Sequence, residues 1–368
     1  MKDAGIYIHV PFCERKCRYC DFYSVKKEET LLNAYVEELL KEIRLNASDN
    51  LDKKILTLYF GGGTPSLLGA STVGRIIDAV TKYYCTDFKE VTIEVNPNSA
   101  EDLDGYKKAG VNRLSVGVQS TDDRILKKLG RLHKAETALK VLEKGMEVFG
   151  NVSADLIIGA DSEQDVSSDL DRILPRCTHL SSYMLSLEEG TPLSKAVSQK
   201  KVSVATEIEV LEQYKTIYDV CLKNGFYRYE VSNFSKLGCE SVHNFAYWKM
   251  KDYLGFGPGA HSYVNGERYY NPSDVKAYVG GAHSGLSGQI SERYFSLEEE
   301  KSEFIMLALR TRDGIDVAEY NRRFSEDFFE RFGSVIKKLS GFLTVSSDRV
   351  SIRPEFLLVQ NSIILELI

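Results

Sequence analysis

The alternation of short apolar runs with amphipathic helical patterns, from residue 5 to about residue 225, constrains the fold most strongly. Apolar runs of strand length that are separated by helices indicate βαβ units and a parallel sheet. The predicted strands span residues 5–10, 55–60, 90–95, 113–118, 153–158 and 179–186. The predicted helices span about 30–46, 71–84, 101–109, 122–130, 134–149, 165–174 and 204–224. Six strands are too few for a closed eight-stranded barrel, so we expect an α/β fold with a partial barrel or an open sheet.

The pattern changes after about residue 230. Residues 233–290 are rich in Gly, Asn, Tyr and Pro and show little periodicity. Helices are then predicted at about 298–310, 316–323 and 326–340, short strands around 342–353 and an apolar helix at about 355–367. We therefore divide the chain into an α/β part, residues 1–230, and a smaller, mostly helical part, residues 231–368, which ends in a winged-helix-like unit.

Charge, hydropathy and cysteine content exclude several classes of protein. The formal net charge is -6 at pH 7 and the basic residues are scattered, so we expect no nucleic-acid partner. No run of about 18 apolar residues exists, which argues against a transmembrane segment. The first ten residues read as a strand without the apolar stretch and cleavage site of a signal peptide, so we expect a cytoplasmic protein. Seven cysteines, three of them clustered, favour a reduced compartment with one metal site over a disulfide framework.

The clustered cysteines, Cys13, Cys17 and Cys20, follow the first predicted strand with the spacing C-x3-C-x2-C. Cysteine thiolates are the usual protein ligands of iron–sulfur clusters. Three closely spaced thiolates can bind three irons of one [4Fe–4S] cubane and leave the fourth iron open for a small ligand. Zinc would require a fourth Cys or His at a comparable spacing, and His9 lies within the strand. The spacing therefore favours a cubane, with zinc as the weaker alternative.

The segment around these cysteines resembles the signature of the radical-SAM superfamily. Its flanks, Tyr-Ile-His-Val-Pro-Phe before the first cysteine and Asp-Phe-Tyr-Ser after the last, resemble those of the HemN/HemW family. The resemblance implies a partial (β/α)6 barrel in which the open iron binds S-adenosylmethionine (SAM). In that family one electron from the cluster cleaves the sulfonium to give a 5′-deoxyadenosyl radical, so an electron donor is an expected partner.

A glycine run follows the second predicted strand, where parallel sheets place their ligands. Glycines let a backbone approach a ligand closely, although a plain tight turn would have the same composition. By resemblance, Gly62, Gly63 and Thr64 contact the methionyl amino group of SAM. Glu94 ends the third strand, where its carboxylate can accept hydrogen bonds from two ribose hydroxyls.

Further polar residues match the SAM pocket of the family. Taken alone, Arg131 could form a surface ion pair and Asp155 could be a buried acid with satisfied hydrogen bonds. Together with Gln119, at the end of the fourth strand, they match the pocket position by position. Other residues match its walls: Tyr7, Tyr19 and Met184.

Three features bear on which branch of the family the chain resembles. The coproporphyrinogen dehydrogenase branch has a further cysteine two residues after the last cluster ligand, where this chain has Phe22, and a longer arm before Tyr7. The segment 243–248 resembles the H-N-x-x-Y-W motif of the heme-chaperone branch. An imidazole can ligate heme iron and aromatic rings can pack on a porphyrin. The resemblance implies a heme site formed by His243, Asn244, Tyr247 and Trp248.

Ligation requires the neutral imidazole, so heme binding is expected to weaken as the pH falls through an ordinary His pKa of about 6.5. His261 is a second candidate ligand, and Cys239 a weaker one. The other histidines are expected to be structural or exposed: His9, His133, His179 and His283. The remaining cysteines are expected in the core: Cys85, Cys177 and Cys221.

The leading hypothesis is a protein that binds a [4Fe–4S] cluster and SAM and passes heme to acceptor proteins. It assigns no catalytic residue, and the sequence does not indicate the oligomeric state. One rival is an oxygen-independent coproporphyrinogen III dehydrogenase, which decarboxylates two propionates in porphyrin biosynthesis. The other is a radical-SAM enzyme of a different substrate, in which the segment 243–248 is structural.

Overall fold

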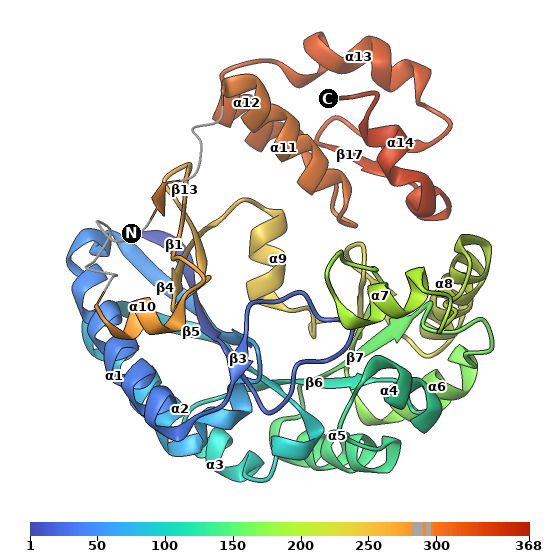
Figure 1. Cartoon of the computed structure of the whole chain (residues 1–368). Helices are drawn as coiled ribbons and strands as arrows, with labels where there is room; N and C mark the ends of the chain where they lie inside the picture. The colour runs from blue at the N-terminus through green and yellow to red at the C-terminus, as the bar shows by residue number, and fades with distance from the viewer. Residues whose placement is uncertain (282–289, 292–295) are drawn as a thin grey trace.

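The computed structural model of the chain describes residues 1–281, 290–291 and 296–368, and is dominated by one curved sheet of twelve described strands (Figure 1). Its central strands are parallel and follow one another across the sheet in the order β11 (Asp252–Phe256), β1 (Lys2–Val10), β4 (Lys53–Gly62), β5 (Cys85–Val95), β6 (Arg113–Gln119), β7 (Val152–Ile158) and β8 (His179–Met184). Antiparallel strands extend both edges. β12 (His261–Val264), β13 (Glu267–Tyr270) and β14 (Ile290–Ser291) follow β11, and β10 (Asn233–Ser235) and β9 (Tyr227–Arg228) follow β8.

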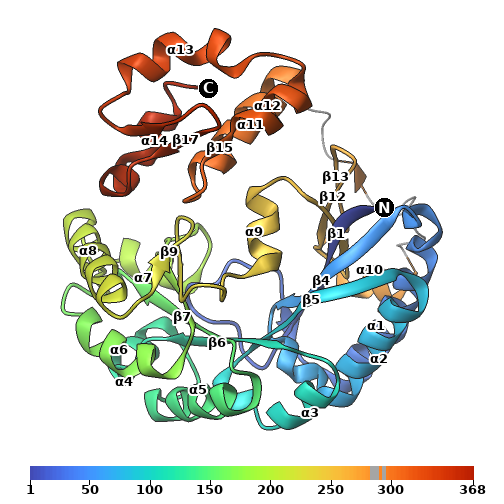
Figure 2. The same cartoon turned by 180° about the vertical axis from the view of Figure 1, so that it is seen from behind.

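Helices cover the outer face of this sheet, as both views show (Figures 1 and 2). They are α1 (Glu29–Asn46), α2 (Ala70–Tyr83), α3 (Leu103–Lys108), α4 (Asp123–Leu129), α5 (Ala135–Phe149), α6 (Val166–Ile173) and α8 (Glu207–Lys223). Every strand and helix predicted before residue 225 is thereby confirmed within a few residues. The short helices α7 (Pro192–Ser198) and α10 (Val275–Val279) were not predicted, because five to seven residues carry too little periodicity.

The two faces of the strands differ in polarity. Side chains alternate across a strand, and one set is apolar and packs in the main core beneath the helices, as Ile6, Ile8, Leu58 and Phe60 do. The alternate positions are polar or small and face the inside of the partial barrel: Gly5, Tyr7, Thr57, Tyr59, Gly61, Glu90, Thr92, Glu94, Arg113, Ser115, Ser153, Asp155, His179 and Ser181. The barrel interior is therefore a polar site rather than a second apolar core.

Helix α9 (Val242–Trp248) lies inside the curve of the sheet, on the opposite side from the covering helices (Figures 1 and 2). The carboxylate of Glu90 on β5 accepts hydrogen bonds from the backbone N–H of Val242, at 2.7 Å, and of His243, at 3.3 Å. A carboxylate at a helix N-terminus satisfies the unpaired N–H groups of the first turn. The side chains of this helix thus reach into the polar interior of the barrel.

The C-terminal part has its own core and contains α11 (Leu297–Leu309), β15 (Ile315–Asp316), α12 (Val317–Phe324), α13 (Phe328–Lys338), β16 (Leu343–Val345) and β17 (Arg349–Ile352). Its three strands form an antiparallel sheet in the order β15-β17-β16. The order helix, strand, two helices and two strands is that of a winged-helix unit. The predicted continuous helix at 355–367 is wrong, because a 3-10 helix at Pro354–Val359 precedes the short α14 (Gln360–Ile364). The small core covers Ile363 and Ile364, while Val359 is half exposed.

The main sheet continues past residue 230, where the sequence pattern changes. β11 pairs in parallel with β1, with Tyr7 opposite Gly255, although the surrounding sequence shows no strand periodicity. Strands of four or five residues contain too few alternations to be recognised. Met250 and Tyr263 pack in the C-terminal core, so the segment between residues 231 and 281 contacts both parts. No helix among the described residues is long and apolar enough to cross a membrane.

Candidate functional site

The three clustered cysteines lie in the loop that leaves the C-terminal end of β1. Two short paired strands, β2 (Phe12–Cys13) and β3 (Val25–Lys26), close this loop at its base. Cys13, Cys17 and Cys20 are half-buried free thiols. Burial raises the pKa of Cys20, and the Cys17 and Cys13 thiols shift it in the same direction.

This arrangement fits a cubane better than a single ion. In the part of the chain that the structure describes, no three His, Cys, Asp or Glu side chains converge as the ligands of one metal ion do. In a cubane each cysteine binds a different iron, so the sulfurs surround the cluster instead of meeting at one point. The half-buried loop offers three thiols near one another, which is the donor set that such a cluster requires.

The glycine run after β4 contacts the cysteine loop directly. The N–H of Gly63 donates to the carbonyl of Val10 at 2.8 Å, and a Cβ at Gly63 would lie 2.6 Å from the carbonyl oxygen of Phe12. Gly62 has φ +106°, and a Cβ there would lie 2.7 Å from the His9 ring. The glycines are therefore required by close approach to β1 as well as by backbone conformation.

Two side chains donate hydrogen bonds to the three clustered cysteines. The hydroxyl of Thr64 lies 3.6 Å from Cys13 Sγ, and Arg131 Nη1 lies 3.4 Å from Cys17 Sγ. Arg131 Nη2 also donates to the carbonyl of Gly117 at 2.8 Å, and its guanidinium bonds the hydroxyl of Tyr19. The surface ion pair considered for Arg131 is thus wrong, because the guanidinium joins the end of β6 to the cysteine loop.

Glu94 lies inside the barrel next to aromatic side chains. The Tyr59 hydroxyl donates to Glu94 Oε1 at 2.8 Å, and the Tyr59 ring stacks on the ring of Tyr7, with centroids 6.1 Å apart. Burial, and then the neighbouring Asp155 carboxylate, raise the pKa of Glu94 to about 7, against hydrogen bonds from Tyr59 and the Gly62 backbone. Within the described residues Tyr59 is the one side chain that donates to Glu94, so this carboxylate can accept further hydrogen bonds from a ligand.

Two buried polar atoms near Gly117, at the end of β6, have no partner in the described residues: Gln119 Oε1 and Arg131 Nε. Buried polar groups are normally hydrogen-bonded, so orphaned atoms indicate a place where a ligand or water binds. Asp155 has partners, because the Ser115 hydroxyl donates to it at 3.3 Å, and burial raises its pKa. Among the predicted pocket residues, Met184 stands apart at the end of β8, where it is 45% exposed.

The imidazole of His243 is enclosed within the barrel rather than presented at the surface. Its Nδ1 is hydrogen-bonded to the hydroxyl of Thr57 at 2.7 Å and its Nε2 to the hydroxyl of Tyr247 at 2.6 Å. The side chain is 1% exposed, and its ring stacks on that of Tyr59, with centroids 5.1 Å apart. Burial, and then the Arg113 charge, lower the pKa of His243 to about 3. Burial thus moves the titration of this imidazole well below the ordinary pKa of about 6.5 that the heme expectation assumes for an unperturbed histidine.

The other residues of the motif line the same helix. Asn244, Tyr247 and Trp248 are half-buried. The Tyr247 ring makes an edge contact with Tyr253 on β11, with centroids 4.5 Å apart. His261, the second candidate, is exposed at the start of β12 and stacks on Tyr270.

The remaining histidines and cysteines follow the expectations with one exception. His9, His133 and His179 are buried and hydrogen-bonded, as expected for structural residues, and His283 lies outside the described residues. Cys177 and Cys221 are buried, and Cys239 is half-buried. Cys85 was expected in the core but is exposed, because it begins β5 and the first five residues of that strand are exposed or half-buried.

Tyr59 and Glu90 were not predicted as site residues. Tyr59 contacts Glu94 and His243, and Glu90 binds the N-terminus of α9. Both face the barrel interior. Tyr59 lies two residues before Gly61 on β4, and Glu90 lies four residues before Glu94 on β5. Polar residues at alternate positions of an otherwise apolar strand were the available indication.

Comparisons with known proteins agree with this geometry. Residues 7–173 match the radical SAM superfamily and residues 295–355 the HemN C-terminal domain. The heme chaperone HemW of Bacillus subtilis is 33% identical over 92% of this chain and 91% of its own length. That of Lactococcus lactis is 32% identical over 95% of this chain and 92% of its own length. The solved structure of coproporphyrinogen III oxidase (HemN) from Escherichia coli has the same fold, with a TM-score of 0.84 over 99% of this chain and 89% of that one, at 18% identity. The chain therefore belongs to the HemN/HemW family of the radical SAM superfamily.

Proposed function

We propose that this protein is a heme chaperone that binds a [4Fe–4S] cluster and SAM and delivers heme to acceptor proteins. The observation that carries the proposal is the match to two HemW heme chaperones over more than nine-tenths of the chain, in both its α/β and its C-terminal part. The polar barrel interior next to three cysteines supports the cofactor part of the proposal.

The chain's own residues divide into two groups around the proposed cofactors. Cys13, Cys17 and Cys20 would bind the cluster, and Thr64 and Arg131 would donate hydrogen bonds to the ligating sulfurs. SAM would lie against the glycine run, with its ribose on Glu94 and its polar groups within reach of the orphaned atoms of Gln119 and Arg131. A cluster with bound SAM supplies one-electron chemistry, for which a protein electron donor is the expected partner.

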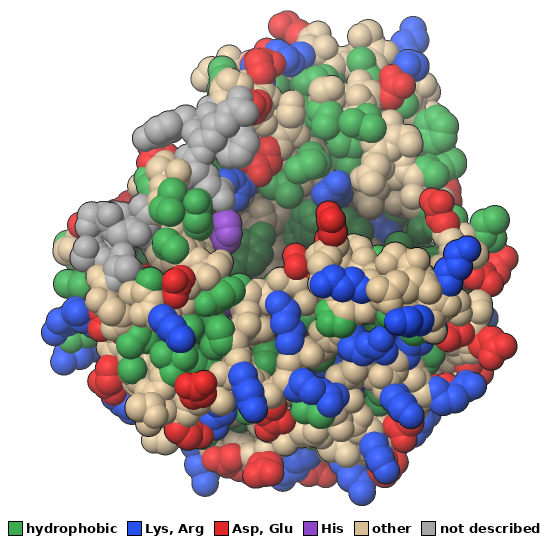
Figure 3. Space-filling model, viewed as in Figure 1, with side chains coloured by type: hydrophobic (Ala, Val, Ile, Leu, Met, Phe, Trp, Pro, Cys, Tyr) green, Lys and Arg blue, Asp and Glu red, His purple; other side chains and the backbone are tan. Residues whose placement is uncertain are grey.

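We place heme on α9 and the hollow above it. Figure 3 shows the molecule hollowed between the barrel and the C-terminal part, with hydrophobic side chains on the upper wall, and Figure 1 places α9 in the same region. A porphyrin is a flat apolar ligand that packs well on aromatic rings, and Asn244, Tyr247 and Trp248 lie half-buried on this helix. Ligation by His243 Nε2 would require the Tyr247 hydroxyl to leave that nitrogen.

The rival function is the oxidative decarboxylation of coproporphyrinogen III. The fold is shared with an enzyme of that name, but one fold supports several functions, so the site must decide. At the position where the resemblance places a further cysteine in that branch, this chain has Phe22, which is 68% exposed. An exposed phenyl ring offers no thiol for substrate chemistry.

One experiment separates the two functions. The protein is reconstituted anaerobically with iron and sulfide, and one sample is divided for two assays. The first measures heme binding and the transfer of bound heme to an apo-hemoprotein. The second measures consumption of coproporphyrinogen III with SAM and a reductant. Heme transfer without consumption supports the chaperone, and consumption without saturable heme binding supports the enzyme.

We expect no conversion of coproporphyrinogen III by the reconstituted protein, because Phe22 replaces the additional cysteine. The measurement is chromatography of porphyrins after incubation with SAM and dithionite. Phe22→Cys is the informative companion variant, since it restores the thiol without touching the cluster ligands. Steady formation of protoporphyrinogen by the parent protein would overturn the chaperone proposal.

Glu94→Ala is expected to weaken SAM binding by about 10- to 100-fold, because hydrogen bonds to a charged group contribute about 1.5–3 kcal/mol. Since the pKa of Glu94 is raised to about 7, the carboxylate gains its charge as pH rises through 7, and SAM affinity of the parent protein should rise over the same interval. Glu94→Gln should remove this pH dependence.

Calorimetric titration with SAM at several pH values tests both expectations. Glu101→Ala removes an exposed carboxylate seven residues further along and should leave the affinity unchanged. Cluster content must be equal in all samples, because SAM binds next to the cluster. Unchanged SAM affinity in Glu94→Ala would remove Glu94 from the proposed site.

A further inference from the structure

The chain turns sharply at Gln119, the last residue of β6. Gln119 has φ +68°, a left-handed conformation that side-chain-bearing residues rarely adopt, and its side chain is buried with Oε1 unpartnered. A residue persists in such a conformation only when the surrounding structure holds it there. The amide and the Arg131 guanidinium both lie against Gly117, where a Cβ would be 3.2 Å from Gln119 Nε2 and 3.1 Å from Arg131 Nη2, and Arg131 in turn donates to Cys17.

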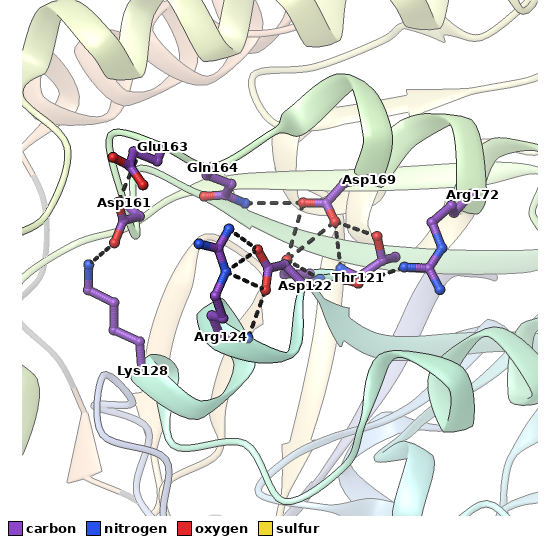
Figure 4. Close-up of polar contacts among 10 residues, drawn as sticks. Thr121, Asp122, Arg124, Lys128, Asp161, Glu163, Gln164, Asp169 and Arg172 are labelled. Carbon is purple, nitrogen blue, oxygen red and sulfur yellow. Dashed lines mark hydrogen bonds and ion pairs between the residues drawn. The ribbon is translucent and has the colours of Figure 1, made fainter.

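The two residues after Gln119 are bound by a single buried carboxylate, Asp169 of α6 (Figure 4). Asp169 Oδ1 accepts from both the backbone N–H and the hydroxyl of Thr121, each at 2.6 Å, and the Ser120 hydroxyl donates to Oδ2 at 3.2 Å. Arg172, one turn further along α6, donates to the carbonyl of Thr121 at 2.7 Å. The backbone N–H and the backbone C=O of Thr121 are therefore both hydrogen-bonded to side chains of α6.

Asp169 is held in the core by hydrogen bonds alone. It is 2% exposed, and within the described residues no Lys or Arg forms an ion pair with it. A buried carboxylate without a cation is costly, and here hydroxyl, amide and backbone donors from Ser120, Thr121 and Gln164 offset that cost. Burial raises the pKa of Asp169, and these hydrogen bonds oppose the shift.

We infer that Asp169 is a positioning residue for the SAM pocket, which acts by holding the turn after β6 so that the Gln119 amide faces the cofactor. The inference rests on the proposed SAM site and extends it to a residue of α6 that lies outside the pocket. Gln119 is the contacting group, and Asp169 acts only through it. Asp165 provides a matched control, because it accepts from the Ser168 N–H at 3.0 Å and caps the same helix without reaching the turn.

A double-mutant cycle on the cluster-loaded protein tests this, with SAM affinity by calorimetry and thermal unfolding measured for every variant. Asp169→Asn should weaken SAM binding by about 10-fold in the parent background and by less than about 2-fold in the Gln119→Ala background, because residues that act through one another are not additive. The thermal destabilisation by Asp169→Asn should be the same in both backgrounds.

Thr121→Val, which removes one donor and keeps the shape, is a milder substitution that should weaken SAM binding by about 2- to 4-fold and remain folded. Asp165→Ala should lower the unfolding temperature and leave SAM affinity unchanged.

The outcomes distinguish this inference from the proposed site. If Gln119→Ala weakens SAM binding but Asp169→Asn and Thr121→Val do not, Asp169 is only a structural residue and the inference is overturned. Equal weakening by Asp169→Asn in both backgrounds would also overturn it, because Asp169 would then act by another route. If Gln119→Ala leaves SAM affinity unchanged, or the parent protein binds no SAM, the proposed site fails and the inference with it.

Discussion

Cys17→Ala is expected to abolish the iron–sulfur cluster. The parent protein should take up about four irons and four sulfides per chain on anaerobic reconstitution, as a cubane requires. The proposed cubane would have three protein ligands, all in this loop, and Cys17 is the one whose sulfur also accepts a hydrogen bond from Arg131. Its loss leaves two thiolates for four irons. Iron and sulfide analysis, with the visible absorption of the cluster, measures the effect, and Cys13→Ala and Cys20→Ala should behave alike.

Two controls separate ligation from misfolding. Cys85→Ala removes an exposed thiol far from the loop in sequence and should retain the full cluster. A bound cluster stabilises the state that binds it, so reconstitution should raise the unfolding temperature of the parent protein and of Cys85→Ala but not of Cys17→Ala. If Cys17→Ala still takes up four irons, the ligand assignment is wrong. Zinc in place of iron in the protein as isolated would favour the alternative metal.

The parallel core of the fold was predictable because each strand is buried on both faces or lies beneath a helix. Such a strand appears in the sequence as a short apolar run, which can be recognised without knowing its neighbours. The C-x3-C-x2-C loop was equally local. In contrast, β11 pairs in parallel with β1 although more than two hundred residues separate them in the sequence. Of its five residues, two are half-buried and one is a glycine. Pairing of that kind depends on long-range contacts that no short window contains.

The site was predicted unevenly for the same reason. The resemblance placed Arg131 and Gln119 in the SAM pocket, and the structure brings them together beside Cys17, but it did not indicate Tyr59, whose ring lies between Glu94 and His243. Nothing in the segment 243–248 predicts that His243 is buried. A histidine in an aromatic segment can face a ligand or the core, and only the position of α9 inside the barrel decides between them.

That burial makes the contacts of His243 the most informative part of the heme proposal. The Tyr247 hydroxyl and the heme iron would compete for the same nitrogen, His243 Nε2. Meanwhile Nδ1 stays bonded to Thr57, which orients the ring. Because burial lowers the pKa of His243 to about 3, the imidazole is neutral throughout the usual pH range. Heme binding through His243 should consequently be independent of pH between about 5 and 8.

The parent protein is expected to bind about one heme per chain, with quenching of Trp248, the only tryptophan of the chain. Tyr247→Phe removes the competing hydrogen bond and should strengthen heme binding by about 2- to 10-fold, since such a bond contributes about 0.5–1.5 kcal/mol. His243→Ala should weaken it by at least about 10-fold and shift the Soret band. It should also lower the free energy of unfolding by about 2–4 kcal/mol, because the Thr57 and Tyr247 hydroxyls lose their partner. Cluster content and unfolding temperature measured on the same samples distinguish lost ligation from lost folding.

If Tyr247→Phe binds heme as the parent does and folded His243→Ala keeps the parent Soret band, His243 is structural. Loss of the Soret band in His261→Ala would then assign the iron to the exposed imidazole of β12.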